Sequence, residues 1–584
     1  MNILSSLNPK QKEAVTILRG PVLVIAGPGS GKTRCLIHRI AYLIQQGIPT
    51  RDILAVTFTN KAAEEMRERV VKLIKQIPTI GTFHAICLQI LRREIDKLGR
   101  QKNFIIYDET DRLSLIKKII NDLQISPEQF KPGAVREVIS RAKDELIDCQ
   151  TYQEQAQEYF PQTVAKIYLE YQKSLKKANA LDFDDLIMLC VQLFKKPEVL
   201  EKYQEQWKYI LVDEAHDTNL SQYILINLLA QKYKNIWFIA DADQSIYSWR
   251  GADFRNILNF EKDYPQTRVI LLEENYRSTK NILAVSHQII SKNTQRKKKN
   301  LWTKNPPGQL INIIETANEK EEGDFLIEEM ENLIRQQRFS LKDFTVLYRT
   351  NAQSRAIEEA FLKTNFPYKI VGTVKFYDRK EIKDILAYLK LIINPRDPVS
   401  LKRIRLKKFY DLIAQFKKAS QRLTLTKLIG LIIEKIDYRN YLLKSEQGES
   451  RWENVQELFT VADKYNDLER FLEDISLLSN HDEVETNKNL VNLMTLHCAK
   501  GLEFPVVFIT GCEEGIFPHS KSFFDPSQME EERRLCYVGI TRAKQRVYLT
   551  FTRQRRLWGQ TMVNQPSRFL ADISKSLVRL EARP

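Results

Sequence analysis

Eight consecutive residues near the start of the chain have the composition and setting of a phosphate-binding loop. The stretch AGPGSGKT (26–33) follows the apolar run PVLVI and precedes a segment with helical spacing. Glycines let backbone N–H groups curl around phosphate oxygens, and the N-terminus of the next helix adds positive potential. A chance Gly-Lys-Thr turn is the alternative, and the strand and helix patterns on either side argue against it. The candidate nucleotide-binding residues are Ala26, Gly27, Pro28, Gly29, Ser30, Gly31, Lys32 and Thr33.

Phosphoryl transfer also needs a metal ligand and a base beside such a loop. Lys32 is expected to reach the β and γ phosphates, and Thr33 to ligate Mg²⁺. Asp213 and Glu214 end the buried-strand pattern YILV (209–212), and the C-terminal end of that strand would face the loop. Asp213 is expected to hold Mg²⁺, and Glu214 to orient and deprotonate the attacking water. A lone Asp-Glu pair is common on protein surfaces, whereas one that ends an apolar strand favours this catalytic interpretation.

The transferred phosphoryl group needs positive charge in its transition state. Arg277 in EENYRS and Arg542 in YVGITRAK are the two candidates, and each lies at the end of a patterned segment. Either residue is equally compatible with an ordinary surface arginine, so these patterns alone leave both roles open.

Apolar runs alternate with helical segments in two parts of the chain. This alternation is typical of α/β domains, in which a parallel sheet has helices on its faces. The expected strands are 21–27, 53–58, 209–212, 236–240 and 268–272 in the first part, and 310–314, 344–348, 490–494, 505–509 and 546–550 in the second. Helices are expected at 31–46 and 60–75, over a region from about 95 to 200, and in a charged insertion between about 382 and 488. The sequence therefore predicts two α/β domains, each interrupted by helices.

The composition fits a globular protein with a polyanionic partner. The 584 residues include 90 Lys and Arg against 74 Asp and Glu, a net charge of +16. This balance favours nucleic acid, although a lysine-rich surface alone gives the same number. The seven cysteines have no CxxC spacing and no His cluster, which argues against a metal cluster or a disulfide framework and predicts a reducing compartment. Neither a signal peptide nor a membrane span is expected, and the basic run QRKKKN (295–300) is interpreted as a solvated or DNA-facing loop.

Further motifs, in a fixed order after the phosphate loop, resemble those of one family. QSIYSWRGA (244–252), ENYRS (274–278), TLHCAKGLEF (495–504) and VGITRA (538–543) are similar to motifs of the UvrD/Rep/PcrA helicases of superfamily 1. LNPKQKEAV (7–15) is similar to the family's adenine-reading motif. The family's DNA-contacting motifs resemble TFTNKAAEEMRERV (57–70), GTFHAI (81–86) and LDFDDLI (181–187). Its C-terminal motifs resemble EEGIFPH (513–519) and PSRFL (566–570). The resemblance covers almost the whole chain. It implies an α/β fold of two RecA-like P-loop domains, each interrupted by a helical insertion.

The resemblance also implies which side chains contact the nucleotide. Gln11 would bind the adenine edge, with Arg34 and Tyr276 on either side of the base. Gln244 would sense the γ-phosphate, and Glu503 would contact the ribose. The implied catalytic set is Glu214, Lys32, Gln244, Arg277 and Arg542, the two arginines serving as arginine fingers. The cofactors would be ATP and Mg²⁺.

A second implied set would contact single-stranded DNA. Its members are Phe58, His84, Phe183, Tyr247, Trp249, Arg250 and Phe517. Aromatic rings that stack on bases tolerate any sequence, as a moving motor requires. Core packing is the alternative for each aromatic ring taken alone. The direction of movement, 3′→5′, is implied by the family and by nothing in the spacing.

Two positions depart from the family's pattern. Ala26 stands where the phosphate loop usually begins with glycine, a change between small residues. His216 stands in VDEAHD where the family normally has glutamine, so the letters of an RNA-helicase box appear in a chain that otherwise resembles DNA helicases. A histidine there still donates and accepts hydrogen bonds, but it gains charge near pH ~6.5. The departure bears on the pH dependence of coupling between ATP and DNA.

The expected domains follow the family's order along the chain. They are 1A (1–92 and 205–277), helical insertion 1B (93–204), 2A (278–381 and 489–584) and a helical accessory domain 2B (382–488). Against the family's pattern, several tens of residues are missing after NPRDPVSLKRI (394–404), which implies a shortened 2B domain. The chain also stops soon after PSRFL, without the basic tail of some relatives.

These observations lead to three hypotheses about function. The first is a DNA-dependent ATPase that moves 3′→5′ on single-stranded DNA and separates duplexes in repair or replication. The second is an ATP-gated factor that displaces proteins from DNA and unwinds poorly, favoured by the shortened accessory domain. The third, an inactive DNA-binding relative, is disfavoured by the intact Lys32, Thr33, Asp213 and Glu214. The expected partners are single-stranded DNA and its junctions with duplex, without a membrane, in the cytoplasm with the nucleoid or in an organelle.

Overall fold

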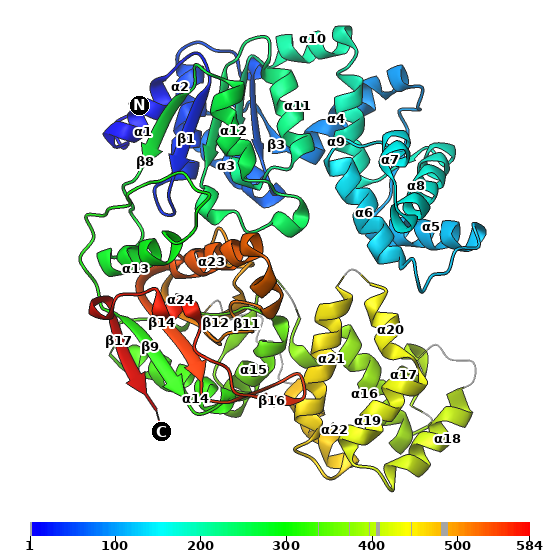
Figure 1. The fold of residues 1–584 in the computed structure, drawn as a ribbon. Helices are drawn as coiled ribbons and strands as arrows, with labels where there is room; N and C mark the ends of the chain where they lie inside the picture. Colours follow the sequence, from blue (N-terminus) through cyan, green and yellow to red (C-terminus); the bar gives the residue numbers. More distant parts are fainter. Residues whose placement is uncertain are drawn as a thin grey trace. The chain divides into compact units, whose positions relative to one another are not determined.

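The chain folds into two compact units, as the computed structural model in Figure 1 shows. The structure describes residues 3–336, 338–372, 374–395, 397–404, 409–445, 447–479 and 489–583. Unit 1 comprises Met1–Arg277 and Gln295–Lys304, and unit 2 comprises Ser278–Thr294 and Asn305–Pro584. The chain therefore passes from one unit to the other after Arg277, after Thr294 and after Lys304.

A six-stranded parallel sheet forms the centre of unit 1. Its strands are β1 (Val22–Ala26), β2 (Ile53–Thr57), β3 (Thr79–Thr82), β6 (Tyr209–Val212), β7 (Ile236–Ala240) and β8 (Arg268–Leu272). They lie in the order β3-β2-β6-β7-β1-β8, and all neighbouring pairs are parallel. The five strands predicted for this part are confirmed. Strand β3, with the sequence TIGT, was not predicted because it is short and lacks an apolar run.

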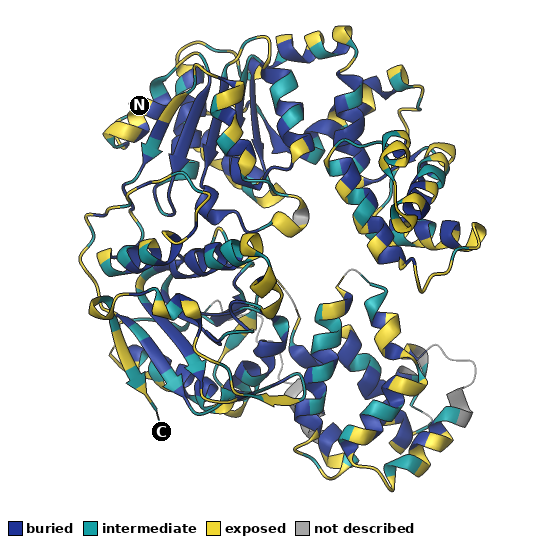
Figure 2. Ribbon diagram, in the orientation of Figure 1, coloured by how far each residue is buried: buried dark blue, intermediate teal, exposed yellow. Residues whose placement is uncertain are grey.

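Both faces of this sheet are covered by helices. Successive side chains of a strand point to opposite faces, so Leu23 and Ile25 belong to one buried cluster and Val22 and Val24 to another. Strand β1 is accordingly dark blue in Figure 2, whereas the edge strand β8 is partly exposed. Helices α1 (Pro9–Thr16), α2 (Lys32–Gln45) and α3 (Asn60–Ile74) contribute to the Val22 cluster. Helices α4 (Phe83–Glu94), α11 (Leu220–Ala230) and α12 (Arg255–Asp263) contribute to the Leu23 cluster.

A helical region interrupts unit 1, as predicted. Its helices are α5 (Glu109–Asp122), α6 (Pro132–Asp144), α7 (Cys149–Gln155), α8 (Tyr159–Lys177), α9 (Phe183–Leu193) and α10 (Pro197–Gln206). The first four share a core of their own, from Ile116 to Ala180, whereas α9 and α10 join the Leu23 cluster of the sheet. The pair β4 (Ile105–Ile106) and β5 (Ala180–Leu181) joins the two ends of the first group.

Unit 2 contains a seven-stranded parallel sheet. Its strands are β9 (Ile311–Thr316), β10 (Phe344–Tyr348), β11 (Tyr368–Ile370), β12 (Val491–Thr495), β13 (Phe504–Ile509), β14 (Ala543–Thr552) and β17 (Val578–Ala582), in the order β11-β12-β10-β13-β14-β9-β17. The accompanying helices are α13 (Lys280–Ile290), α14 (Glu319–Arg335), α15 (Ser354–Lys363), α23 (Pro526–Ile540) and α24 (Arg568–Ala571), with a hairpin of β15 (Arg555–Leu557) and β16 (Gln560–Met562). The five strands predicted here are confirmed. The edge strands β11 and β17 were not predicted because neither is an apolar run.

The insertion in unit 2 is also helical. Its helices are α16 (Lys380–Ile393), α17 (Pro398–Arg403), α18 (Phe409–Ser420), α19 (Leu425–Lys435), α20 (Tyr438–Leu443), α21 (Gly448–Ala462) and α22 (Leu468–Ser479). They share one core that runs from Phe376 to Ile475. The buried pair Arg355–Glu457, at 2.5 Å, connects α15 with α21. Residues 480–488 of the predicted insertion lie outside the described residues. In the described ranges, no helix has the length and apolar character needed to cross a bilayer.

Candidate active site and nucleic-acid interface

The predicted motifs of unit 1 gather at one edge of its sheet. The phosphate loop follows β1, Asp213 and Glu214 follow β6, Asp241 follows β7, and the segment to Arg277 follows β8. Because all six strands are parallel, their C-terminal ends lie along the same edge. Ligands of open α/β sheets bind at this edge.

The phosphate loop has the backbone conformation that its glycines predict. Gly29 and Gly31 have φ of +66° and +82°, which residues with a Cβ rarely adopt. Helix α2 begins directly after Gly31, at Lys32, so its free N–H groups face the loop. The side chain of Asn275 donates to Pro28 O at 2.7 Å, and Tyr276 N–H donates to Gly29 O at 2.9 Å. The ENYRS segment is therefore fixed directly on the loop.

The three side chains predicted to surround adenine lie beside that loop. Gln11 is buried, and its Nε2 donates to Ser30 O at 2.9 Å. Arg34 donates to Ser6 O at 2.7 Å. The Tyr276 hydroxyl accepts a hydrogen bond of 2.7 Å from Asn8, and its ring is 47% exposed. An exposed ring beside a buried amide is an arrangement that suits a planar base.

Asp213 and Glu214 form an acidic pair in which Asp213 is buried and the Glu214 side chain is 30% exposed. Burial, and then the charge of Glu214, raise the pKa of Asp213 to about 7, against the opposing effect of Lys32. Glu214 has a φ of +47°, and among the described residues its Oε2 is buried without a hydrogen-bond partner. Two adjacent carboxyls, one with an unsatisfied oxygen, within electrostatic reach of Lys32 at the start of α2, fit a divalent cation. Mg²⁺ typically takes one or two protein ligands and completes its shell with phosphate and water.

His216 is accommodated in the position where the family has glutamine. Its ring is fully buried, and Nδ1 accepts a hydrogen bond of 3.1 Å from Asp241 N–H. A ring nitrogen that accepts is unprotonated, so the proton of the neutral ring is on Nε2. That Nε2 lies 3.5 Å from Glu214 Oε2 and 3.7 Å from Asp217 Oδ1. The ring thus connects the acidic pair with the turn that follows β7.

The turn after β7 carries the predicted phosphate sensor. Gln244 is buried, and its Nε2 donates to Asp241 Oδ2 at 2.6 Å. Ser245 Oγ donates to His216 O at 3.2 Å. The chain continues from here into Tyr247 and Trp249, so the sensor and the first predicted DNA contacts lie on one short segment.

Aromatic side chains of unit 1 form two groups at the same edge. Phe58 and Tyr247 are nearly parallel, with ring centroids 6.0 Å apart, and Tyr247 meets Trp249 edge to face. Trp249 is 62% exposed. Phe183, 47% exposed, meets His84 edge to face. Exposed rings next to partly buried ones suit a stacking surface better than core packing does.

Two other residues of the predicted DNA set have a different outcome. The side chain of Arg250 lies outside the described residues. The ring of Phe517 is fully buried in this structure and packs edge to face on Phe569. Phe517 therefore packs in unit 2, and its contact with DNA stays a prediction.

The residues predicted in unit 2 lie at the start of neighbouring strands. Glu503 precedes β13 and pairs with Lys544 at 2.8 Å. Arg542 precedes β14, is buried, and donates to Val538 O at 2.9 Å. Glu503 and Arg542 belong to unit 2, and Arg277 belongs to unit 1.

The acids of LDFDDLI are neutralised by cations of the helical insertion. Lys143 is buried and contacts Asp182 at 2.7 Å and Asp185 at 2.8 Å. Arg112 contacts Asp184 at 2.7 Å. Across the described ranges, no group of three or more His, Cys, Asp or Glu residues is arranged to hold a metal ion. These acids therefore form part of the scaffold around Phe183.

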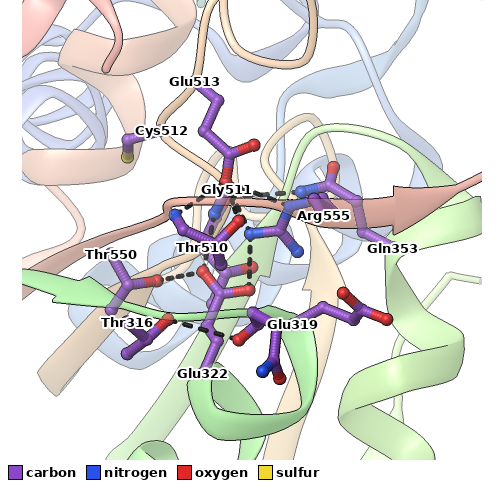
Figure 3. A network of polar contacts seen from close by, with 12 residues as sticks. Thr316, Glu319, Glu322, Gln353, Thr510, Gly511, Cys512, Glu513, Thr550 and Arg555 are labelled. Carbon is purple, nitrogen blue, oxygen red and sulfur yellow. Dashed lines mark hydrogen bonds and ion pairs between the residues drawn. The ribbon is translucent and has the colours of Figure 1, made fainter. Parts of the chain in front are cut away.

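A buried network in unit 2 gives Glu513 of EEGIFPH a structural role (Figure 3). Arg555 is 3% exposed and contacts both Glu322 and Glu513 at 2.8 Å. Glu322 also accepts a hydrogen bond from Thr550 Oγ1 at 2.5 Å, and Glu513 one from Thr552 N–H at 3.0 Å. The network joins α14, the end of β14 and the loop after β13. Nothing in the sequence pattern indicated it, because its members lie far apart along the chain.

The interpretation of the basic run 295–300 as a solvated or DNA-facing loop is wrong for two of its residues. The side chains of Arg296 and Lys299 are 8% and 2% exposed. Arg296 contacts Asp243 at 2.7 Å, and Lys299 contacts Asp241 at 2.5 Å. The acidic partners follow β7, more than fifty residues earlier, so the run itself contains no sign of them. Lys298 is exposed, as expected.

Asp144 connects the helical insertion of unit 1 with the strand-end loops. Its Oδ1 accepts a hydrogen bond of 2.6 Å from Asn219 Nδ2, and a Cβ on Gly251 would lie 2.9 Å from its Oδ2. Burial, and then the charge of Asp184, raise the pKa of Asp144 to about 7.

The variant Asp144→Asn is expected to be more thermostable than the wild type at pH 8 and little different at pH 4. Between the unfolded pKa near ~3.9 and a folded pKa of about 7, the folded carboxyl keeps a proton that the unfolded chain has lost. Wild-type stability therefore falls as pH rises through this window. Asparagine keeps the acceptor for Asn219 and has no charge to desolvate. Thermal unfolding across this range should show a gap that grows to roughly 1–2 kcal/mol, and a gap independent of pH would contradict the assignment.

Comparisons with known proteins agree with this arrangement. The model of the UvrD/REP helicase N-terminal domain matches residues 7–265, and that of the UvrD-like helicase C-terminal domain matches residues 270–434 and 405–554. The chain is 45% identical to "ATP-dependent DNA helicase PcrA" of Bacillus subtilis, over 99% of this chain and 87% of that protein. It is 43% and 42% identical, with the same coverage, to proteins of that name from Staphylococcus aureus and Staphylococcus epidermidis. The B. subtilis alignment spans 640 positions, more than the 584 residues of this chain, so that relative has residues without a counterpart here. Matches over this length and at this identity show that the chain belongs to the UvrD/REP family of helicases.

Proposed function

We propose that this chain, an ATP-dependent DNA helicase by family, moves 3′→5′ on single-stranded DNA and uses ATP with Mg²⁺ to separate duplexes at junctions. One observation carries the proposal beyond the comparisons. The phosphate loop, the acidic pair and the segment that carries Tyr247 and Trp249 all follow C-terminal ends of strands in one sheet. Nucleotide and single-stranded DNA would therefore bind along the same edge of unit 1.

The residues of this edge have distinct roles in the proposed reaction. Lys32 and the N–H groups of the loop hold the phosphates, and Asp213 with Thr33 would hold Mg²⁺, which neutralises charge on the phosphate oxygens. Glu214 accepts a proton from the attacking water. Gln244 contacts the γ-phosphate. Arg277 of unit 1 and Arg542 of unit 2 are proposed to stabilise the transition-state charge.

A direct physical link supports coupling between hydrolysis and DNA. His216 Nδ1 accepts a hydrogen bond from the backbone of Asp241, and its Nε2 faces Glu214, the proposed proton acceptor. The same turn leads within a few residues to Tyr247 and Trp249. A DNA base that stacks on these rings would contact the same segment that carries Gln244, and so could change the position of Gln244.

The variant Trp249→Ala is expected to weaken binding of single-stranded DNA by about 5- to 150-fold. Loss of one base-stacking ring costs roughly 1–3 kcal/mol. The slope of affinity against salt should not change, since no charge is removed. Fluorescence anisotropy with a labelled oligonucleotide measures both quantities. Tyr159→Ala, which removes another exposed ring of unit 1 (72% exposed), serves as control and should bind as the wild type does; equal losses in the two variants would contradict the assignment.

A second candidate function is displacement of proteins from DNA with weak unwinding. The observation that favours it is the set of residues in the B. subtilis protein that have no counterpart in this chain. A shortened accessory domain would account for such a difference.

Two assays on the full chain separate these functions. Strand separation is measured with duplexes that carry a 3′ or a 5′ single-stranded tail, and displacement with streptavidin on a biotinylated single strand. Unwinding of the 3′-tailed duplex supports the helicase proposal, and preference for the 5′ tail would overturn the proposed direction. Displacement without unwinding would favour the second function.

A further inference from the structure

The segment 295–304, called the strap, belongs to unit 1 and contacts three of the strand-end segments there. The chain enters the strap from unit 2 after Thr294 and returns to unit 2 after Lys304. Arg296 and Lys299 contact the turn after β7. Leu301 lies so close to Gly27 that a Cβ on this glycine would collide with its side chain.

The strap also pairs with the segment that leads to Arg277. Asn300 N–H donates to Glu273 Oε1 at 2.7 Å, and Trp302 N–H donates to Glu273 O at 3.0 Å. Trp302 O accepts in turn from Asn275 N–H at 2.8 Å. Three strand-end segments, after β1, β7 and β8, are thus attached to one short piece of chain.

The contacts of Lys299 and Arg296 have the geometry of strong ion pairs. Lys299 Nζ bridges Asp241 Oδ1 at 2.5 Å and Asp243 Oδ2 at 2.6 Å. Arg296 binds both oxygens of Asp243, at 3.0 and 2.7 Å, the two-point geometry that fixes orientation as well as distance. Burial opposes ionisation of Lys299 and Asp241, but their mutual attraction outweighs it, so the pKa of Lys299 is raised and that of Asp241 is lowered.

We propose that the strap is a positioning element of the nucleotide site, in which Arg296 and Lys299 act through Asp243 and Asp241. Asp241 accepts from Gln244 Nε2 at 2.6 Å, so a fixed Asp241 carboxylate orients the phosphate sensor. Its backbone N–H holds His216, whose ring faces Glu214. The strap therefore sets the geometry of groups that act on the γ-phosphate and touches no substrate itself. This inference rests on the proposed function, since it deepens the account of the same site.

The test compares four substitutions in the strap of the full chain. Arg296→Gln and Lys299→Met remove the two buried contacts, and Arg296→Lys keeps a charge opposite Asp243. Lys298→Gln removes a neighbouring exposed charge and is the matched control. For each protein, kcat and KM for ATP are measured with saturating oligo-dT, and oligo-dT affinity is measured at several salt concentrations.

Arg296→Gln and Lys299→Met are expected to lower kcat by about 10- to 100-fold, because a misplacement of about 1 Å at reacting groups has effects of that size. KM for ATP and affinity for oligo-dT should stay within about 3-fold of wild type, and Arg296→Lys should recover most of kcat. Lys298→Gln should leave all three quantities unchanged. In ATP-free protein, Arg296→Gln should also speed hydrogen exchange at 241–249. If Lys299→Met fails to fold, the proposal is tested by comparing kcat of the two Arg296 variants with that of Lys298→Gln.

Two results would overturn the proposal. One is an unchanged kcat in Arg296→Gln. The other is an equal loss of oligo-dT affinity in the three charge-removing variants, with a salt slope shallower by about 0.7 per charge and normal kcat, which would make the run a DNA-binding loop. Wild-type hydrolysis with and without oligo-dT, measured first, tests the proposed function separately. The hydrogen-exchange comparison tests the strap without reference to activity.

Discussion

Replacing Glu214 by glutamine is expected to lower the DNA-stimulated rate of ATP hydrolysis by at least about 100-fold while ATP still binds. Glutamine has the shape of glutamate but cannot accept the proton of the attacking water, and a positioned base contributes about 10²- to 10⁴-fold. The charge of Glu214 raises the pKa of Asp213. Its removal therefore favours the ionised form of Asp213, and binding of Mg²⁺ and nucleotide should not weaken.

The measurement is single-turnover hydrolysis beside nucleotide binding by isothermal titration calorimetry. Glu201→Gln, which neutralises an exposed acid paired with Lys232 on the surface of unit 1, is the control and should hydrolyse ATP at the wild-type rate. Hydrolysis by Glu214→Gln within about 10-fold of wild type would mean that another group is the base. Loss of nucleotide binding in the same variant would mean that Glu214 holds the nucleotide rather than acting on water.

Arg555→Met is expected to destabilise unit 2 by about 3–5 kcal/mol. Arg555 is the cation between the buried carboxylates of Glu322 and Glu513, and removing one member of a buried ion pair leaves uncompensated charge at that cost. Methionine fills much of the space of the arginine stem, so the effect reports the lost charge rather than a cavity. The loop after β13 and the hairpin of β15 and β16 should loosen first, since Glu513 and Arg555 join them.

Arg553→Met is the matched control, two residues earlier in the chain. Arg553 pairs with Glu315 at 2.9 Å, but its side chain is 52% exposed, and exposed pairs contribute about 0–1 kcal/mol. Urea unfolding, with hydrogen exchange in the loop after β13 and in the hairpin of β15 and β16 as the local readout, compares both variants with wild type. Equal stability of the two variants would show that the network in Figure 3 is not a major source of stability in unit 2.

The local geometry of the nucleotide site follows closely from sequence. Apolar runs ending in AGPGSGKT, in Asp213–Glu214 and in the residues before Arg277 become strands of one parallel sheet, and parallel strands place such endings on one edge. The glycines at 29 and 31 take the backbone conformations that only glycine adopts readily. For the nucleotide site, the local sequence pattern and the geometry of a parallel sheet are sufficient to predict where these residues lie.

Long-range pairing accounts for what the sequence did not reveal. The lysine-rich run at 295–300 has the composition of a solvated loop, and only the folded chain brings Lys299 to Asp241 and Arg296 to Asp243. Phe517 has the residue type of a stacking ring but packs on Phe569. The residue type shows which interactions a side chain can make. Its burial and its neighbours in the fold decide which of those interactions it makes.

The most direct test of the whole account is steady-state ATP hydrolysis by the purified full chain, with and without oligo-dT, in the presence of Mg²⁺. The account predicts slow hydrolysis without DNA and stimulation of at least about 10-fold by oligo-dT, a step of roughly 1.4 kcal/mol in the activation barrier. Stimulation should be lost in Lys32→Ala, which removes the phosphate-binding ammonium. Hydrolysis that is absent under all conditions, or equal with and without oligo-dT, would contradict a motor in which the edge of one sheet binds both nucleotide and DNA.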